Sequence, residues 1–272
     1  MGSPLQRDGE THAPRVSRPR PGDENAGAAA YDVHVLPDSE VTRALVVAAH
    51  PDDIDFSAAG SVASFTEAGV DVAYLIVTYG DAGGFDPDVP RTEIPRIRQA
   101  EQLAAAKQVG VSDVRFLGYP DGRVEPTLEL RRDIARVIRQ VRPHRMIVPT
   151  PERNYTRMAP SHPDHRAVGA ATLDAIYPDA RNPFAHPELA AEGLEAWTVG
   201  EAWMTGGPSL NHFPDVTSTF ERKLAALRAH ASQIVHIGDL EGMLRTWMGA
   251  NAQTGGLPAG RLAEAFQVLD TA

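Results

Sequence analysis

The stretch that decides the fold is ALVVAAHPDD, residues 44–53, in which an apolar run leads directly into polar side chains. Six apolar residues without polar alternation are typical of a strand buried on both faces, as in a parallel sheet. His50, Asp52 and Asp53 follow almost at once. Because open parallel sheets bind ligands outside the carboxyl ends of their strands, these three side chains are the first candidates for a functional site.

The rest of the chain continues to alternate apolar runs with helical segments. Further strands are expected over residues 72–78, 114–117, 146–149 and 199–204. Helices are expected over residues 57–68, 91–109, 128–141, 165–176 and 219–230. This alternation predicts an α/β fold, with a Rossmann-like, doubly wound, mainly parallel sheet, helices on both faces and a C-terminal extension.

Composition narrows the class of protein. Residues 1–30 combine four prolines and mixed charges with almost no large apolar side chains, which predicts a disordered tail, followed by a single domain over residues 31–272. The 26 basic and 36 acidic residues give a formal net charge of −10, which argues against a nucleic-acid partner. No stretch approaches the ~20 apolar residues of an integral membrane segment, and no signal peptide is recognisable. We therefore expect a cytoplasmic location, and the oligomeric state stays open.

Two clusters of polar residues indicate a metal site. In a dinucleotide-binding fold, a glycine-rich turn would stand where His50, Asp52 and Asp53 follow the first strand. The second cluster, SHPDH at residues 161–165, comes after the fourth strand, so both clusters lie at the same edge of the sheet. Either cluster alone is compatible with a simple turn at the start of a helix, but their joint occurrence favours metal binding. The chain has no cysteine, so His50, Asp53 and His165 are the expected ligands, with one coordination position left open.

The two clusters together resemble the paired signature of the PIG-L / LmbE-like family of zinc-dependent N-acetylglucosamine deacetylases, which includes enzymes acting on glycopeptide-antibiotic precursors. The resemblance implies that His50, Asp53 and His165 hold Zn²⁺ and that Asp52 is the general base. It further implies that His162 stabilises the oxyanion or protonates the leaving amine, with Asp164 orienting it. Two histidines and one carboxylate also suit Fe²⁺ or Mn²⁺.

Two residues are candidates for binding the substrate, which we expect to be a small glycoconjugate. Arg98 resembles an arginine of the family that faces the sugar, although a solvated helix face explains it equally well. Asp121 follows the third strand and is placed to accept a sugar hydroxyl, although an ordinary Pro-Asp-Gly turn is as good an explanation.

Three functional hypotheses remain open at this point. The first is hydrolysis of an N-acetyl or longer N-acyl group on glucosamine. The second is an amidase that cleaves a larger amide on a mycothiol-conjugate-like substrate. The third is a sugar-binding module without catalysis, and metal content separates this hypothesis from the other two.

Overall fold

The computed structural model describes residues 35–155 and 158–272, so the predicted tail over residues 1–30 lies outside the described residues. Within the described part, six strands form one sheet in the order β3-β2-β1-β4-β5-β6. Neighbouring strands from β3 to β5 are parallel, and β6 is antiparallel to β5. The bounds are β1 (Arg43–Ala48), β2 (Asp71–Thr78), β3 (Asp113–Tyr119), β4 (Arg145–Pro149), β5 (Glu201–Thr205) and β6 (Gln267–Asp270).

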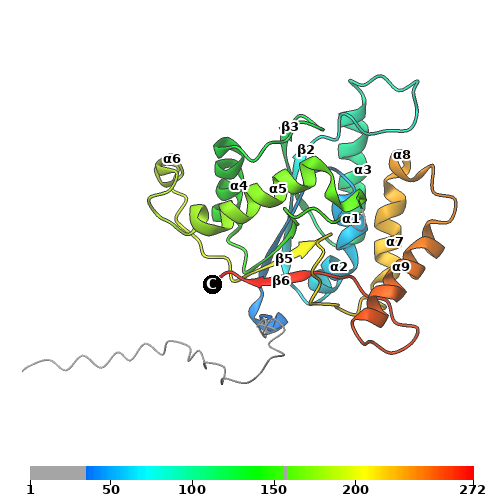
Figure 1. Ribbon diagram of the computed structural model, residues 1–272. Coiled ribbons are helices and arrows are strands. Elements are labelled where there is room, and N and C mark those ends of the chain that lie inside the picture. Colours follow the sequence, from blue (N-terminus) through cyan, green and yellow to red (C-terminus); the bar gives the residue numbers. More distant parts are fainter. Residues whose placement is uncertain (1–34, 156–157) are drawn as a thin grey trace, which may run out of the picture. The chain divides into compact units, whose positions relative to one another are not determined.

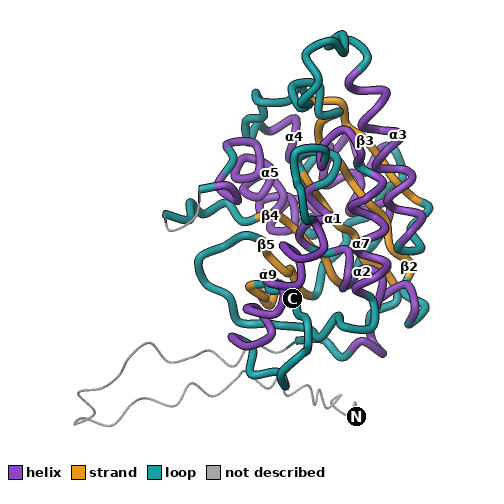
Figure 2. Tube along the Cα trace, turned by 90° about the vertical axis from the view of Figure 1, so that its right-hand side faces the viewer, coloured by secondary structure: helices purple, strands orange, loops and turns teal. Residues whose placement is uncertain are grey.

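Helices cover both faces of this sheet (Figure 1). One layer contains α4 (Leu128–Val141), α5 (Pro163–Asp174), the π-helical segment η3 (Ala175–Ala180) and α6 (Pro187–Ala191). The other contains α1 (Asp53–Ser57), α2 (Ala59–Glu67), α3 (Ile94–Gln108), α7 (Phe220–Ala229), α8 (Ala231–Ile234) and α9 (Leu240–Thr254). Short 3₁₀ turns lie at η1 (Asp38–Glu40) and η2 (Ala159–Ser161). Figure 2 looks onto the side that carries α7 and α9. None of the described helices has the length and apolar character needed to cross a membrane.

The central strand β1 contributes to two cores because its successive side chains point to opposite faces. Leu45 and Val47 pack into the core under α4 and α5, whereas Ala44 and Val46 pack into the core under α2 and α3. A strand that is buried on both faces has no solvent-facing side. The absence of polar alternation in residues 44–49 is thereby explained.

The strand order places the site at the centre of the sheet. From β1 the chain proceeds outward through β2 and β3, and then returns to the other side of β1 with β4 and β5. Where the order reverses, the loops after β1 and β4 diverge and leave a crevice, which is where doubly wound folds bind ligands. The two polar clusters stand in these two loops.

The predicted fold class is confirmed, with differences in detail. The helix expected over residues 57–68 is observed as α2, and the short helix α1, which ends just before Ala58 with its non-helical angles, was not predicted. The helix over residues 128–141 has the predicted bounds. The C-terminal extension contains the 15-residue helix α9 and the four-residue edge strand β6, which the sequence pattern did not predict.

Candidate active site

The loop after β1 has a strained backbone at Asp52. Its φ of 96° lies in the left-handed region, which a short polar side chain tolerates better than most. The Asp52 N–H donates to Gln102 Oε1 at 2.9 Å, and its carbonyl accepts from the N–H groups of Asp55 and Phe56. These bonds hold the strained turn and start α1, so that Asp52 and Asp53 both remain at the sheet edge.

Three predicted ligands converge on one point of this edge. His165 Nε2 lies 3.3 Å from His50 Nδ1 and 3.0 Å from one oxygen of Asp53, whose other oxygen is 3.4 Å from His50 Nδ1. A tetrahedral ion with bonds of about 2.0–2.1 Å separates its ligand atoms by roughly 3.3 Å. The two imidazole nitrogens and the two oxygens of the Asp53 carboxylate therefore lie at distances that a zinc-sized ion could bridge.

The opposite ring nitrogen of His50 faces two carboxylates. Its Nε2 lies 3.1 Å from Asp121 Oδ1 and 3.2 Å from Asp164 Oδ2. Burial alone lowers the pKa of His50, but the charge of Asp53 and the bonds to Asp121 and Asp164 outweigh burial and raise this pKa to about 12. The site thus favours positive charge. Because the two carboxylates contact Nε2, Nδ1 is the nitrogen on the side of the other two predicted ligands, and metal-binding histidines commonly have such a partner on their second nitrogen.

These contacts give the carboxylates of Asp164 and Asp121 a partner that the sequence did not predict, the His50 ring. Asp164 was predicted to orient His162, and its backbone N–H does donate to His162 Nδ1; its carboxylate, however, contacts His50 and accepts the N–H groups of Gly122 and Val124. Asp164 is fully buried, and these bonds outweigh the effect of burial and keep its pKa below the usual value. Asp121 was expected to bind a sugar hydroxyl, and its carboxylate also contacts His50.

Both oxygens of the Asp121 carboxylate contact other groups of the protein. Its Oδ2 accepts the N–H of Ala82 at 3.2 Å, while Oδ1 faces His50. The side chain is 8% exposed. Both oxygens of Asp121 therefore have partners within the protein, one of which is the predicted metal ligand His50.

Arg98 also occupies a different place from the one predicted. It is 4% exposed and donates to the carbonyl oxygens of Gly80 and Pro51 and to Asp52 Oδ2, the last at 3.1 Å. A Cβ atom on Gly80 or Gly83 would come within 2.5 Å of its guanidinium. These glycines therefore leave room for Arg98 behind Asp52, where its guanidinium is bonded to the carboxylate.

The Asp52 carboxylate combines burial with a nearby cation. Burial raises the pKa of Asp52 and the charge of Arg98 lowers it; burial has the larger effect, and the resulting pKa is about 7. A carboxylate with such a pKa can accept and release a proton near neutral pH. This property suits the role of general base that the sequence predicted.

His162 lies beside the same group of residues. It caps α5, and its ring centre is 4.9 Å from that of His50 and 5.3 Å from that of His165. The Asp164 N–H donates to His162 Nδ1 at 3.2 Å, so the neutral ring carries its hydrogen on Nε2. Burial and the neighbouring histidines lower its pKa. A neutral His162 with its hydrogen on Nε2 can donate a hydrogen bond to an oxyanion, the first of the two roles that the family resemblance implies.

Behind Asp52 lies a buried polar network that was not predicted from the sequence. Gln102 Nε2 donates to Asp55 Oδ2 at 2.8 Å, and His230 Nε2 lies 2.8 Å from the same oxygen. All three side chains are fully buried. His230 directly follows α7 and is far from the site in sequence, so no local spacing could have associated it with Asp55.

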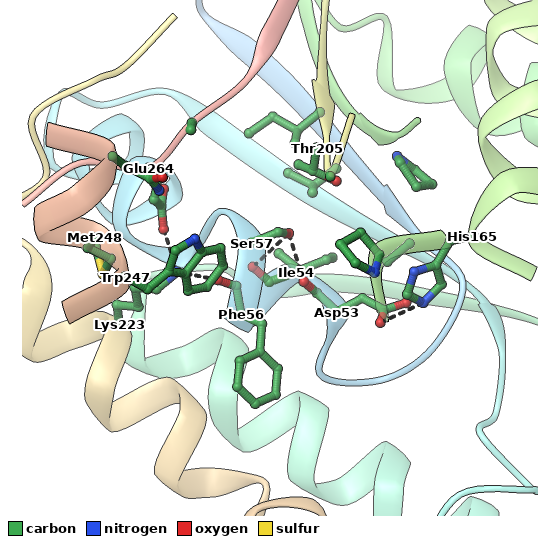
Figure 3. A pocket seen from close by; sticks show the side chains of 18 of the residues that line it. Asp53, Ile54, Phe56, Ser57, His165, Thr205, Lys223, Trp247, Met248 and Glu264 are labelled. Carbon is green, nitrogen blue, oxygen red and sulfur yellow. Dashed lines mark hydrogen bonds and ion pairs between the residues drawn. The ribbon is translucent and has the colours of Figure 1, made fainter. Parts of the chain in front are cut away.

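The open side of the ligand group borders a cavity of about 380 Å³ (Figure 3). Asp53 and His165 line one end of it, and α9 lines the other. We call it the apolar cavity because most of its lining residues are apolar, among them Ile54, Phe56, Ile237, Met243, Trp247 and Met248.

Comparisons with known proteins show relatives over most of the chain. The family model described as PIG-L: GlcNAc-PI de-N-acetylase matches residues 45–176, which include both polar clusters. The diacetylchitobiose deacetylase of Thermococcus kodakarensis is 32% identical over 197 residues, covering 72% of each chain. The probable N-acetyl-alpha-D-glucosaminyl L-malate deacetylase 2 of Bacillus cereus is 33% identical over 196 residues, covering 70% of this chain and 82% of that protein.

A solved structure supports the fold over most of the chain. The N,N'-diacetylchitobiose deacetylase from Pyrococcus horikoshii superposes with a TM-score of 0.79 at 26% identity. The superposition covers 86% of either chain. It therefore extends well beyond the residues that the family model matches.

Proposed function

Because the chain belongs to the PIG-L family, we propose that it is a metal-dependent hydrolase that removes the acetyl or acyl group from the glucosamine nitrogen of a small glycoconjugate. The relatives named above are deacetylases of compounds that contain N-acetylglucosamine. The observation that carries the proposal is the convergence of His50, Asp53 and His165 beside Asp52.

The donor set fits a divalent cation. His50 Nδ1, Asp53 and His165 Nε2 would hold it, and their spacing of 3.0–3.4 Å supports a zinc-sized ion. A cation in this site supplies Lewis-acid chemistry, which makes water more acidic and polarises a carbonyl group. We propose Zn²⁺, with Fe²⁺ or Mn²⁺ as the alternatives that these ligands also accept.

Asp52 handles the proton in this proposal. Its carboxylate accepts a proton from the attacking water and delivers it to the leaving nitrogen. Arg98, 3.1 Å from Asp52 Oδ2, keeps the carboxylate in one orientation and so acts as a positioning residue. Gln102 fixes the Asp52 backbone from the other side.

His162 stabilises the negative charge that develops on the carbonyl oxygen. Its Nε2–H is the donor, because its Nδ1 accepts from the Asp164 backbone. Fixed donors of this kind are effective because they need no reorganisation during the reaction. Asp121 and Asp164 act one step further away, by fixing the His50 ring.

The test is an amine-release screen against N-acetylglucosamine-containing compounds, with the full chain before and after chelation. We expect release that is lost on chelation and restored by Zn²⁺. Release that is indifferent to chelation, or no release from any compound by metal-loaded protein, would contradict the proposal. A cytoplasmic location and a role in antibiotic biosynthesis stay predictions from the sequence.

A further inference from the structure

The apolar cavity begins at the place where the proposed reaction occurs. Asp53 and His165 form one end of its lining, and Trp247 and Met248 lie at the opposite end in Figure 3. An amide carbonyl carbon beside the proposed metal ligands carries two substituents, the nitrogen with its sugar and the acyl chain. One of these two substituents must point towards the cavity.

The wall of the cavity suits a hydrocarbon better than a sugar. Apart from its metal-ligand end, it is formed mainly by aliphatic, aromatic and thioether side chains. Several polar lining groups are already bonded to the protein: Ser57 Oγ donates to the Asp53 carbonyl, and Lys223 Nζ donates to the Phe56 carbonyl and to Glu264. A sugar would lose its hydrogen bonds to water there without replacement, at a considerable cost in free energy.

The polar groups of the site other than Asp53 and His165 lie outside the cavity. Asp52, His162 and Arg98 are described by the structure but stand outside the cavity lining. The sugar nitrogen needs the proton that Asp52 carries, so the sugar belongs on the Asp52 side. The acyl chain is then the substituent that remains for the cavity.

The cavity is also larger than an acetyl group requires. The methyl of an acetyl group is close in size to a water molecule, whose share of liquid volume is about 30 Å³, whereas the cavity measures about 380 Å³. Its far wall is firm, because the Lys223–Glu264 ion pair is buried and Glu264 also accepts the N–H groups of Gly60 and Ser61.

The far wall belongs to the C-terminal part of the chain. Ile237, Met243, Trp247 and Met248 lie outside residues 45–176, which the family model matches. The cavity therefore has the proposed metal ligands, from the matched region, at one end and a far wall from outside that region at the other.

We propose that the apolar cavity binds the hydrocarbon chain of an N-acyl group longer than acetyl, so that the preferred substrate carries a medium-length fatty acyl group on its glucosamine nitrogen. This inference rests on the proposed function. In the reaction, the water oxygen bonds to the acyl carbon, the C–N bond breaks and the nitrogen gains a proton. A fatty acid and a free amine leave.

The experiment measures kcat/KM for amine release from N-acyl-glucosamines with straight chains of two to ten carbons, using the full metal-loaded chain. Burial of one methylene contributes about 0.8 kcal/mol, which corresponds to a change of about fourfold in an equilibrium or rate constant. We expect kcat/KM to rise by up to about fourfold per added methylene until the cavity is filled. Octyl N-acetylglucosaminide, which places the same hydrocarbon on the anomeric oxygen, is the matched substrate and should gain little.

Two variants of α9 locate the effect. Trp247→Ala should lower the ratio of octanoyl to acetyl kcat/KM by about tenfold, and this ratio is insensitive to loss of folded enzyme. Gln253→Ala, an exposed change on the same helix outside the cavity lining, should leave the ratio unchanged. Calorimetry on metal-free protein gives a second readout, in which octanoate should bind on the order of 100-fold more tightly than butyrate.

The outcomes separate the two proposals. Robust acetyl release without any gain from longer acyl chains overturns the acyl-chain inference and leaves the proposed function standing. A gain with octyl N-acetylglucosaminide alone assigns the cavity to the aglycone and also overturns it. An unchanged ratio in Trp247→Ala contradicts binding in this cavity. No release from any compound overturns both proposals.

Discussion

Replacing Asp164 with asparagine tests whether the carboxylates around His50 support metal binding. In the structure, Asp164 Oδ2 and Asp121 Oδ1 lie 3.2 and 3.1 Å from the same His50 Nε2. The sequence instead predicted that Asp164 orients His162. The two assignments lead to different results, because the first acts on metal affinity and the second on turnover alone.

The two nearly equal distances determine the expected magnitude. Loss of a hydrogen-bonding partner behind a metal-bound histidine typically weakens metal binding about 10- to 100-fold. Since Asp121 remains in place, we expect Asp164→Asn to weaken Zn²⁺ binding by about tenfold, the lower limit of this range. The double variant with Asp121→Asn removes both carboxylates and should lose more than the two single losses combined, because each carboxylate covers for the other.

The assay is competition for Zn²⁺ with a chromophoric chelator, run on wild type, both single variants and the double variant. Urea unfolding of the metal-free proteins is the control, since an amide at position 164 no longer satisfies both backbone N–H groups, at a cost of about 1–3 kcal/mol. If Asp164→Asn binds Zn²⁺ as tightly as wild type but turns over slowly, and has no further effect in a His162→Ala background, the structural assignment is wrong.

Further predictions concern the residues behind and beside the metal ligands. Arg98→Leu should lower kcat with KM within about twofold in steady-state kinetics, and a rise in KM alone would return Arg98 to sugar binding. Asp52→Asn and His162→Ala should each lower kcat by ~10²–10⁴-fold with full metal content by elemental analysis; metal-free protein would contradict their roles. His230→Ala should destabilise the fold by about 3–5 kcal/mol in urea unfolding. Burial lowers the His230 pKa, but Asp55 raises it overall, so the loss should be full below pH ~6.5 and shrink as pH rises through the folded-state pKa.

Patterns within short stretches of sequence predicted much of the fold. The short apolar run of residues 44–49 favours a buried parallel strand, which β1 confirms, and the amphipathic pattern of residues 128–141 indicates a helix with one buried face. The strand β6 escaped prediction because it has only four residues and pairs at the sheet edge with β5. Its existence depends on tertiary pairing, which local pattern does not encode.

The site shows the same limit. Spacing brought His50, Asp53 and His165 together correctly, because both clusters follow neighbouring parallel strands. Spacing could not show which neighbour a carboxylate faces, so Asp164 was assigned to His162. It also could not associate Asp55 with His230, whose hydrogen bond joins residues 175 positions apart.

The central claim is that His50 Nδ1, Asp53 and His165 hold the metal, and the two sides of the His50 ring make this claim directly testable. The measurement is the anomalous scattering of crystals of the Zn²⁺-loaded chain at the zinc edge. We predict one strong peak about 2.0–2.2 Å from His50 Nδ1, Asp53 and His165 Nε2. A peak on the other side of the ring, among His50 Nε2, Asp121 and Asp164, or no peak in the site, would contradict the account.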